Sequence, residues 1–426
     1  MSADTIFALS SGSPPAAIAV VRLSGPDAGA ALSALCGSIP APRHAALRTL
    51  RDADRSVLDR ALVLYLPGPG SATGEDCAEL HLHGGRAVIA AVESALAALP
   101  RLRRAEPGEF TRRAFANGRM DLAEAEGLAD LLAAETELQR RNAQALATGA
   151  LSHQVEAWRV ELLGLAALVE ANLDFADEDD VATMPSDFAH RCDALAAGLA
   201  QWLGVPRAEA LREGYRVTIA GPPNSGKSSL FNALLGEEAA IATPIAGTTR
   251  DVLSRPVSIA GVPFLISDTA GIREDTDDVV ERIGVARARE EVGKADLVIW
   301  LGAEGEGPSQ AIEIESMTDR DDRIRKSQPD FRVSAKTMEG IPALATALVE
   351  RARSAMPRPG QVAVSRRQGV LLEQARIAVA SAAEEIDPLL VAEQLRLACI
   401  AFDRLTGRAA TEDMLDALFG RFCIGK

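Results

Sequence analysis

The chain has 426 residues and a formal net charge of −15. One hydrophobic core rarely fills that length, so we expect about two to four domains. Hydrophobic residues make up 47% and charged residues 25% of the chain, which is typical of a globular protein in water. The negative net charge excludes a diffuse electrostatic attraction to nucleic acid, so any RNA contact needs a local patch or a partner.

The cysteines and the first residues indicate a cytoplasmic location. Five cysteines lie far apart in the sequence, and none has the spacing of a zinc site or of C-x-x-C. A reducing compartment is the simplest interpretation. The N-terminal residues lack a basic segment followed by a long apolar one, and no apolar run is long enough to span a bilayer. We therefore expect no signal peptide and no membrane partner.

Residues 1–118 alternate short apolar runs with turns, which predicts an α+β domain. Strands are expected at residues 17–23, 61–66 and 78–83, and a helix over residues 86–99.

Residues 119–210 have the periodicity of helices. One helix is expected to place a stripe on a single face, formed by Leu122, Ala125, Ala129 and Leu132. A second long helix is expected over about residues 152–173, and the acidic segment 174–180 that follows is interpreted as a solvated loop.

Residues 214–355 alternate strands and helices, as a P-loop α/β domain does. The segment 356–360, MPRPG, then predicts a linker. Helix resumes over residues 361–422, with one apolar stripe made of Val391, Leu395, Ala398, Phe402 and Leu405. The α/β domain is therefore expected to be inserted in a helical domain, with boundaries at 1–118, 119–210, 211–356 and 357–426.

Residues 221–228, GPPNSGKS, match the phosphate-binding pattern G-x-x-x-x-G-K-[ST]. A β-rich run at 216–220 precedes the loop and a helical segment at 229–235 follows it, as the motif requires. The glycines let backbone N–H groups close around phosphates, and the helix turns its positive end toward them. Lys227 is expected to contact the β- and γ-phosphates, and Ser228 to bind Mg²⁺.

Two further segments support a nucleoside triphosphate site. Residues 264–267 lead into DTAG at Asp268, Thr269, Ala270 and Gly271. A carboxylate at the end of this strand can hold Mg²⁺ through water, and Gly271 can offer its N–H to the γ-phosphate. GTTRD lies between the two motifs at residues 247–251, and Thr249 is expected to add a hydroxyl to Mg²⁺.

The base-binding end departs from the usual pattern. Guanine is usually bound by N-K-x-D, whose aspartate accepts from N1 and N2 of the base. Here the sequence at 316–319 is SMTD, so Asp319 is present but the asparagine and lysine are not. Ser334, Ala335 and Lys336 fit the second base-contacting loop. Because the segment between Trp300 and Val333 is short, we expect guanine preference with loose binding.

Hydrolysis needs a group other than the glutamine that often follows D-x-x-G, since Ile272 stands there. Glu281 can position a water, although an exposed helical acid is the alternative interpretation. Arg250 and Arg273 can stabilise transition-state charge, and each is equally compatible with a surface ion pair. The side-chain carbonyl of Asn224 can hold a monovalent cation where an arginine finger stands elsewhere.

These motifs, with segments at both ends of the chain, are similar to those of the tRNA modification GTPase family MnmE, also called TrmE. The segments are DTI at 4–6, VRLSG at 21–25, ELHLHGG at 79–85, PGEFTRRAF at 107–115, NGRMDLA at 117–123 and FCIGK at 422–426. The resemblance implies a multidomain α/β and α protein. It has an α+β folate-binding-like N-terminal domain that dimerises, a helical domain, and an inserted Ras-like P-loop GTPase domain.

The resemblance further implies a reaction and its participants. The family acts with an FAD-dependent partner, MnmG, which would also bind much of the tRNA. It installs an aminomethyl or carboxymethylaminomethyl group at carbon 5 of the wobble uridine, position 34, of certain tRNAs. A tetrahydrofolate derivative, 5-formyl or 5,10-methylene, carries the one-carbon unit. Its contacts would fall on Arg22, Glu79, Arg119 and Lys426.

The resemblance also assigns the GTPase site. K⁺ would be bound by Asn224, Thr243, Ile245 and Thr248 and would drive the pairing of two GTPase domains, with Glu281 as the catalytic glutamate. Further GTP contacts are expected from residues of the same motifs: Ser225, Gly226, Ser229, Thr243, Thr248, Thr249, Thr269 and Ala270.

Other interpretations are kept beside this one. An Era- or Der-type ribosome-assembly GTPase would predict a tandem GTPase domain or a basic RNA-binding surface, and the sequence has one P-loop and an acidic balance. Cys423 is a candidate thiol in a terminal CIGK that only superficially resembles a lipidation signal. His81 and His83 are expected to share one face of a strand, which is half a metal site or ordinary packing.

Overall fold

The computed structural model describes residues 4–174, 185–236, 253–268, 292–358, 360–420 and 422–425. The chain divides into two compact units, which are described separately. The first unit is Met1–Ala129 with Asp403–Lys426, and the second is Asp130–Phe402. Within the described residues, none of the helices combines the length and the apolar character that crossing a bilayer requires.

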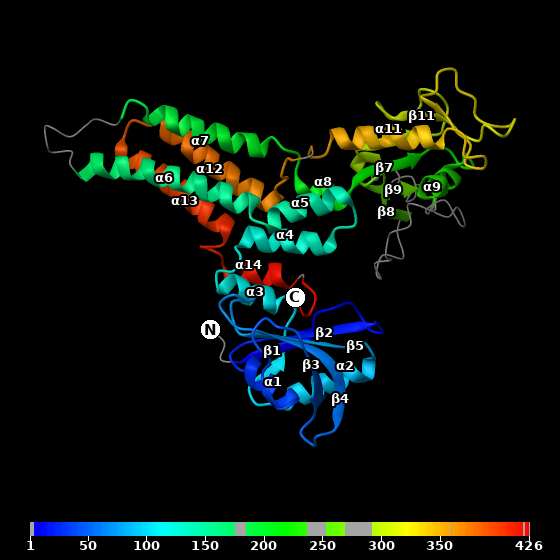
Figure 1. Cartoon of the computed structure of the whole chain (residues 1–426). Coiled ribbons are helices and arrows are strands. Elements are labelled where there is room, and N and C mark those ends of the chain that lie inside the picture. Colours follow the sequence, from blue (N-terminus) through cyan, green and yellow to red (C-terminus); the bar gives the residue numbers. More distant parts are fainter. Residues whose placement is uncertain are drawn as a thin grey trace, which may run out of the picture. The chain divides into compact units, whose positions relative to one another are not determined.

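A six-stranded sheet forms the first unit, in the order β3-β4-β5-β2-β1-β6 (Figure 1). Its strands are β1 (Thr5–Leu9), β2 (Ile18–Ser24), β3 (Ala46–Arg51), β4 (Val57–Leu66), β5 (Cys77–His83) and β6 (Leu102–Arg104). Apolar residues alternate along β2: Ala19, Val21 and Leu23 are buried, and Val20 and Arg22 are not. This alternation places one face of the sheet in a core and leaves the other open.

Helices α1 (Ala28–Cys36) and α2 (Arg86–Ala97) cover the buried face. Leu32 of α1 and Val92 of α2 belong to one apolar cluster with Val21 and Leu80 of the sheet. The expected strands at 17–23, 61–66 and 78–83 and the helix over 86–99 are confirmed, with small shifts at their ends.

The end of the chain is part of the first unit. Helices α3 (Glu109–Ala116) and α14 (Glu412–Phe419) contact each other, and Phe419 and Phe422 pack in one apolar cluster with Leu122 at the start of α4 (Leu122–Ala133). At Gly108, which has a φ of +69°, an added Cβ would lie 2.2 Å from the carbonyl oxygen of Phe419. Only glycine allows this approach of the two backbones.

Four long helices lie side by side in the second unit (Figure 1). They are α6 (Ala150–Asp174), α7 (Phe188–Leu203), α12 (Arg366–Glu384) and α13 (Pro388–Thr406). Trp158 of α6 stacks on Phe402 of α13 at a centroid distance of 6.2 Å and meets Trp202 of α7 edge-on. The stripe expected on α13 is confirmed, since Val391, Leu395, Ala398, Phe402 and Leu405 are all buried.

Leu132 does not join the stripe expected with Leu122. It is 47% exposed, whereas Leu122 and Ala125 are buried. Leu132 lies in the last turn of α4, and the apolar cluster that Leu122 and Ala125 enter includes no residue of α4 after Ala129. The acidic segment expected to be a loop covers residues 174–180: Asp174 is the last residue of α6, and residues 175–180 lie outside the described residues.

The P-loop domain is built on a second six-stranded sheet, in the order β12-β11-β10-β7-β9-β8. Its strands are β7 (Tyr215–Ala220), β8 (Leu253–Ile259), β9 (Val262–Asp268), β10 (Leu297–Trp300), β11 (Ile312–Glu315) and β12 (Phe331–Arg332), all parallel except β8. Helices α9 (Lys227–Leu235) and α11 (Ile341–Ser354) pack on it. Residues 301–311 and 316–330 form loops without helix, so the predicted shortening of this part is confirmed.

The chain enters and leaves the P-loop domain at one joint. Ala208, in α8 (Ala208–Glu213), donates its N–H to the carbonyl of Val364 at 3.0 Å. Asn142, in α5 (Glu137–Ala147), pairs with the peptide groups of Ala363: its Oδ1 accepts from the N–H at 2.7 Å, and its Nδ2 donates to the carbonyl at 3.3 Å. The buried amide of Asn142 thus fixes the segment that returns from the P-loop domain against α5.

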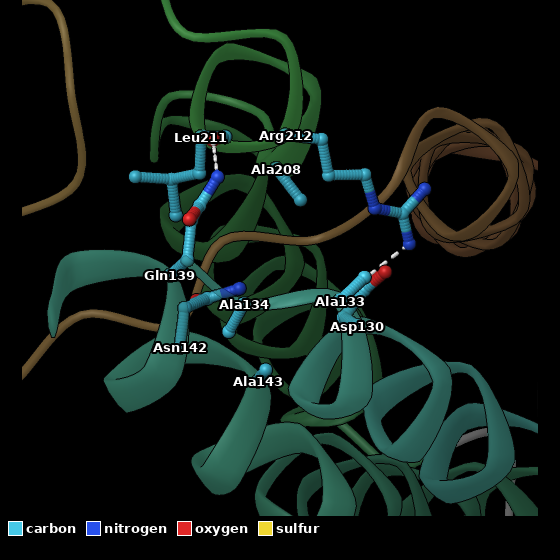
Figure 2. Close-up of a pocket in the computed structure, with 9 residues that line it drawn as sticks. All are labelled: Asp130, Ala133, Ala134, Gln139, Asn142, Ala143, Ala208, Leu211 and Arg212. Atoms are coloured by element: carbon cyan, nitrogen blue, oxygen red, sulfur yellow. Dashed lines mark hydrogen bonds and ion pairs between the residues drawn. The ribbon is translucent and has the colours of Figure 1, made fainter. Parts of the chain in front are cut away.

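A small cavity of about 210 Å³ adjoins this joint. Figure 2 shows Gln139 reaching from α5 to the carbonyl of Leu211 in α8, at 2.8 Å, and Arg212 pairing with Asp130 at 2.6 Å. The floor is lined with alanines, among them Ala134 and Ala143. These two interactions join α8, which directly precedes the P-loop domain, to helices α5 and α4.

We expect Asn142→Ala to lower the free energy of unfolding by about 2 kcal/mol, because it leaves both peptide groups of Ala363 without that partner. Denaturant unfolding of the whole chain measures this loss. Gln144→Ala, at an exposed position of the same helix, is the matched control. Equal loss in both variants would contradict a special role for the Asn142 amide.

Candidate nucleotide site

The P-loop follows the central strand of the second sheet. β7 lies between β9 and β10 and runs parallel to both, so the carboxyl ends of all three meet at one edge. Ligands of open α/β sheets bind at this edge. The loop at 221–228 leaves β7 there and leads directly into α9, as expected.

Three backbone positions give the loop its curvature. Gly221, Asn224 and Gly226 have φ angles of +149°, +59° and +92°. A Cβ at Gly221 would lie 3.1 Å from the amide nitrogen of Gly302, so the loop is packed against the end of β10. Asparagine is among the few other residues that tolerate the left-handed region.

Lys227 is the first residue of α9 and is only 6% exposed. Its ammonium donates to the carbonyls of Gly221 and Pro222, at 3.0 and 2.7 Å. These bonds hold the charge within the ring of the loop. The amino-terminal N–H groups of α9 open on the same loop, so cation and helix dipole together favour an anion.

Ser228 and Asp268 meet beside the loop. The Ser228 hydroxyl donates to Oδ2 of Asp268 at 2.7 Å, and the carboxylate is 2% exposed at the end of β9. A hydroxyl and a carboxylate are hard oxygen ligands, which suit Mg²⁺. The two residues expected at the metal are thus in direct contact, and their donor set fits the ion.

The base-binding end is held by hydroxyls. Ser334 donates to Oδ1 of Asp319 at 2.7 Å, and this bond, with the nearby charge of Lys336, lowers the pKa of the exposed Asp319 carboxyl. Ser316, at the position of the missing asparagine, donates to the carbonyl of Ser225 at 2.6 Å. The expected loops at 316–319 and 334–336 therefore lie together, and the first is bonded to the P-loop.

Sequence reasoning did not anticipate the bond from Ser316 to Ser225. A serine in place of asparagine suggests only loss of function, and the partner is a backbone carbonyl 91 residues away. Ser229 lies on α9 next to Ser228 and is exposed. Ala335 is half-buried in the loop between Ser334 and Lys336.

Several predicted site residues lie outside the described residues. They are Thr243, Ile245, Thr248, Thr249, Arg250, Thr269, Ala270, Gly271, Arg273, Glu281 and Lys426.

A second group of predicted residues meets on the open face of the first sheet. Arg22 and Glu79 are directly opposite each other on β2 and β5, and the guanidinium donates to Oε1 at 2.9 Å and 3.1 Å. His81 lies 3.2 Å from the other carboxylate oxygen of Glu79. This contact was also not anticipated, although the two-residue spacing on a strand is the signal that could have found it.

The two histidines contact different carboxylates. His83 pairs with Asp59 at 2.8 Å, whereas His81 contacts Glu79. No cluster of three or more His, Cys, Asp or Glu ligands occurs among the residues that the structure describes. The packing alternative is therefore favoured.

The chain end lies against β1. Ser10, just after β1, donates to the carbonyl of Gly425 at 2.8 Å, and Ile424 forms a β-bridge with Pro107. Cys423 is exposed. Arg119 packs beside Gly74, where an added Cβ would lie 3.2 Å from its Cγ. Two ends of the sequence thus meet in one unit.

We expect Ser334→Ala to weaken GDP binding about fivefold, since Asp319 loses the bond that orients it. The same change should raise the pKa of Asp319 toward its ordinary 3.8, because the bond that lowers it is gone. The carboxylate must be ionised to accept from the base. Wild-type affinity should therefore hold as pH falls from about 7 to about 5, and the low-pH loss should begin at higher pH in the variant.

Titration of GDP by fluorescence from about pH 7 down to below 3.8, the ordinary pKa of this carboxyl, measures the effect. Thr346→Ala is the control, since that hydroxyl donates to the Pro342 carbonyl within α11. Superimposable low-pH profiles for Ser334→Ala and wild type would contradict the coupling.

Known families and proteins match the chain along nearly its whole length. The family model described as the MnmE helical domain matches residues 122–423, and the one described as GTP-binding protein TrmE N-terminus matches residues 5–119. A tRNA modification GTPase MnmE of Erythrobacter litoralis is 62% identical, covering 99% of this chain and 100% of the relative. A protein of the same name from Novosphingobium aromaticivorans is 59% identical over equal shares.

Among solved structures, the G domain of the T. maritima FeoB iron transporter is 27% identical. The match covers 32% of this chain and 98% of that one, and its TM-score of 0.23 is too low to bear on the fold. The family models together span nearly the whole chain, and the relatives match it from end to end. The chain therefore belongs to the MnmE (TrmE) family of tRNA modification GTPases.

Proposed function

We propose that this protein is a K⁺-activated GTPase that, with the FAD-dependent partner MnmG, modifies carbon 5 of the wobble uridine of certain tRNAs. The one-carbon unit comes from a tetrahydrofolate derivative. The observation that carries the GTPase part is the contact between Ser228 of the P-loop and Asp268 of β9, beside a buried Lys227. Family membership supports the tRNA part.

Binding follows from the loop. Lys227 and the amino end of α9 attract the β- and γ-phosphates, since both offer positive charge and N–H donors. Mg²⁺ would be held by Ser228, Thr249 and, through water, Asp268, and would neutralise charge between the phosphates. Asp319 would accept from the edge of guanine, with Ser334 orienting it.

Hydrolysis requires an oriented water and cations at the developing charge. Ile272 has no hydrogen-bonding group, so we assign the water to Glu281. K⁺ would be held by Asn224, Thr243, Ile245 and Thr248. Arg250 and Arg273 are candidates to stabilise the transition state further. The positive φ of Asn224 supports this assignment, because it places a non-glycine residue at the bend of the loop.

The folate contacts are proposed on Arg22, Glu79, Arg119 and Lys426. A carboxylate such as Glu79 accepts from the N–H groups of a pterin ring, and cations suit the carboxylates of a folate tail. The ion pair of Arg22 with Glu79 on the open sheet face supports this site. The bond between Ser10 and Gly425 supports a contribution from the next residue, Lys426.

A homodimer through the N-terminal domain is proposed on the same open face. Ile18, Leu47 and Leu62 are 60%, 52% and 39% exposed there, an apolar surface that a second copy would cover. With a net charge of −15, the protein would leave much of the tRNA contact to the partner. The domain boundaries at 118, 210 and 356 stay proposals, with residues 403–426 grouping with the N-terminal domain.

We expect GTP hydrolysis to be about tenfold or more faster in KCl than in NaCl, because the smaller Na⁺ fits a ligand cage sized for K⁺ poorly. Phosphate release at constant Mg²⁺ and ionic strength measures the rates. Asn224→Ala should remove the difference while leaving a low basal rate. Equal rates in the two salts for the wild type would contradict the role given to the cation.

Cells lacking this gene should accumulate tRNAs whose wobble uridine lacks its carbon-5 substituent. Mass spectrometry of nucleosides from digested tRNA detects the change, and the wild-type gene should restore it. Complementation with Glu79→Gln should fail, and complementation with Gln144→Ala, at an exposed helix position, should succeed. Unchanged nucleosides in the deletion strain would rule out the proposed reaction.

A further inference from the structure

The loop that replaces N-K-x-D is bonded on both sides. Before Met317, the Ser316 hydroxyl donates to the carbonyl of Ser225, and both residues are buried. After it, the N–H of Thr318 donates to the carbonyl of Val333 at 3.2 Å. Met317 itself has a φ of +54°, in the left-handed backbone region that residues other than glycine rarely adopt. The hydrogen bonds of Ser316 and Thr318 therefore fix the backbone on both sides of Met317, and with it the position of the Met317 side chain.

The Met317 side chain lies on the P-loop. A Cβ added at Gly226 would be 3.3 Å from Cγ of Met317 and 3.7 Å from its Sδ. Gly226 is the residue directly before Lys227 and α9. An apolar, polarisable thioether thus covers the loop at the point where it turns toward the base-binding loops.

Met317 adds no charge at this end of the site. A lysine at this position would bring an ammonium to the edge of the P-loop, and methionine brings none. The cation nearest in effect is Lys336, whose charge lowers the pKa of Asp319. The buried hydroxyl of Ser225 also has no hydrogen-bond partner among the described residues, although Ser225 is only 2% exposed. The hydroxyl of Ser225 and the uncharged side chain of Met317 therefore both lie at this end of the P-loop.

We propose that Met317 sets the affinity of this protein for its nucleotide, while Asp319 alone sets the preference for guanine. The proposal rests on the proposed GTPase function and separates two properties that one loop usually combines. Ser316 keeps the loop on the P-loop through the Ser225 carbonyl, so Asp319 stays in place. Met317 contacts the nucleotide through apolar atoms. It lacks the electrostatic attraction to the nucleotide that a cation in its place would add.

The test is a set of GDP and ADP titrations on the purified full chain with Mg²⁺. Met317→Lys should tighten GDP binding about tenfold, as a charge-assisted contact does, and should leave the ratio of GDP to ADP affinity unchanged. Met317→Ala should weaken GDP binding about threefold, because the apolar platform is removed. The two changes act in opposite directions at one position, which a general loss of folding does not reproduce.

Met338→Lys is the matched control. Met338 is also a methionine with positive φ, at +61°, in the same domain, and its side chain is 46% exposed. The variant adds the same charge without the contact at Gly226, so GDP affinity should stay within about twofold of wild type. An equal gain in Met338→Lys would assign the effect to net charge and overturn the proposal.

Asp319→Asn separates this proposal from the proposed function. An amide at this position offers the opposite hydrogen-bond pattern, so binding should shift from GDP toward the xanthine analogue. If it shifts but Met317→Lys and Met317→Ala both leave GDP affinity unchanged, Met317 has no role in affinity and only this proposal fails. If Asp319→Asn produces no shift, guanine is not bound by this loop, and the base-binding part of the proposed function fails as well.

Discussion

The amide of Asn142 joins the segment before the P-loop sheet to the segment after it. A domain placed inside another must leave and return at one point, and the peptide groups at that crossing are buried and need partners. Asn142 offers one acceptor and one donor to the N–H and carbonyl of Ala363. The N–H of Ala208 closes the crossing by donating to Val364. Ala208 and Ala363 also belong to the core of the P-loop domain, so the joint and the core share residues.

The joint has a direct connection to β9, the strand that ends in Asp268. Helices α5 and α8 both contact β9, and a Cβ at Gly261, just before β9, would lie 3.9 Å from Cβ of Glu137 in α5. The same strand ends in Asp268, which accepts from Ser228. One end of β9 is therefore packed against the joint, and the other end carries the carboxylate of the nucleotide site.

In the first unit, close backbone contacts rather than a side-chain amide hold distant segments together. Its chain end is held by backbone contacts that only glycine allows, at Gly108 against Phe419 and at Gly425 against Leu9. An added Cβ at Gly425 would lie 2.0 Å from the carbonyl oxygen of Leu9. These approaches hold Gly425 beside β1, the strand next to β2, which carries Arg22.

The sequence by itself determined the features that depend on neighbours along the chain. The P-loop, the strand that leads into Asp268 and the buried stripe of α13 follow from local spacing, because periodicity places side chains on a face. The same reasoning placed Leu132 in one stripe with Leu122, but Leu132 is exposed and Leu122 is buried. A stripe cannot show where its partner surface ends, and α4 extends beyond the cluster that Leu122 enters.

Only the tertiary structure decided which distant groups meet. Ser316 bonds a carbonyl of the P-loop, Asn142 bonds a peptide 221 residues away, and Ser10 bonds one 415 residues away. Contacts group residues 403–426 with residues 1–129, whereas the helical pattern placed them in the second half of the helical domain, whose family model matches residues 122–423. A hydrogen bond between a side chain and a distant backbone group leaves no period and no fixed spacing in the sequence. It arises only once packing has brought the two segments together, because burial then requires each polar group to find a partner.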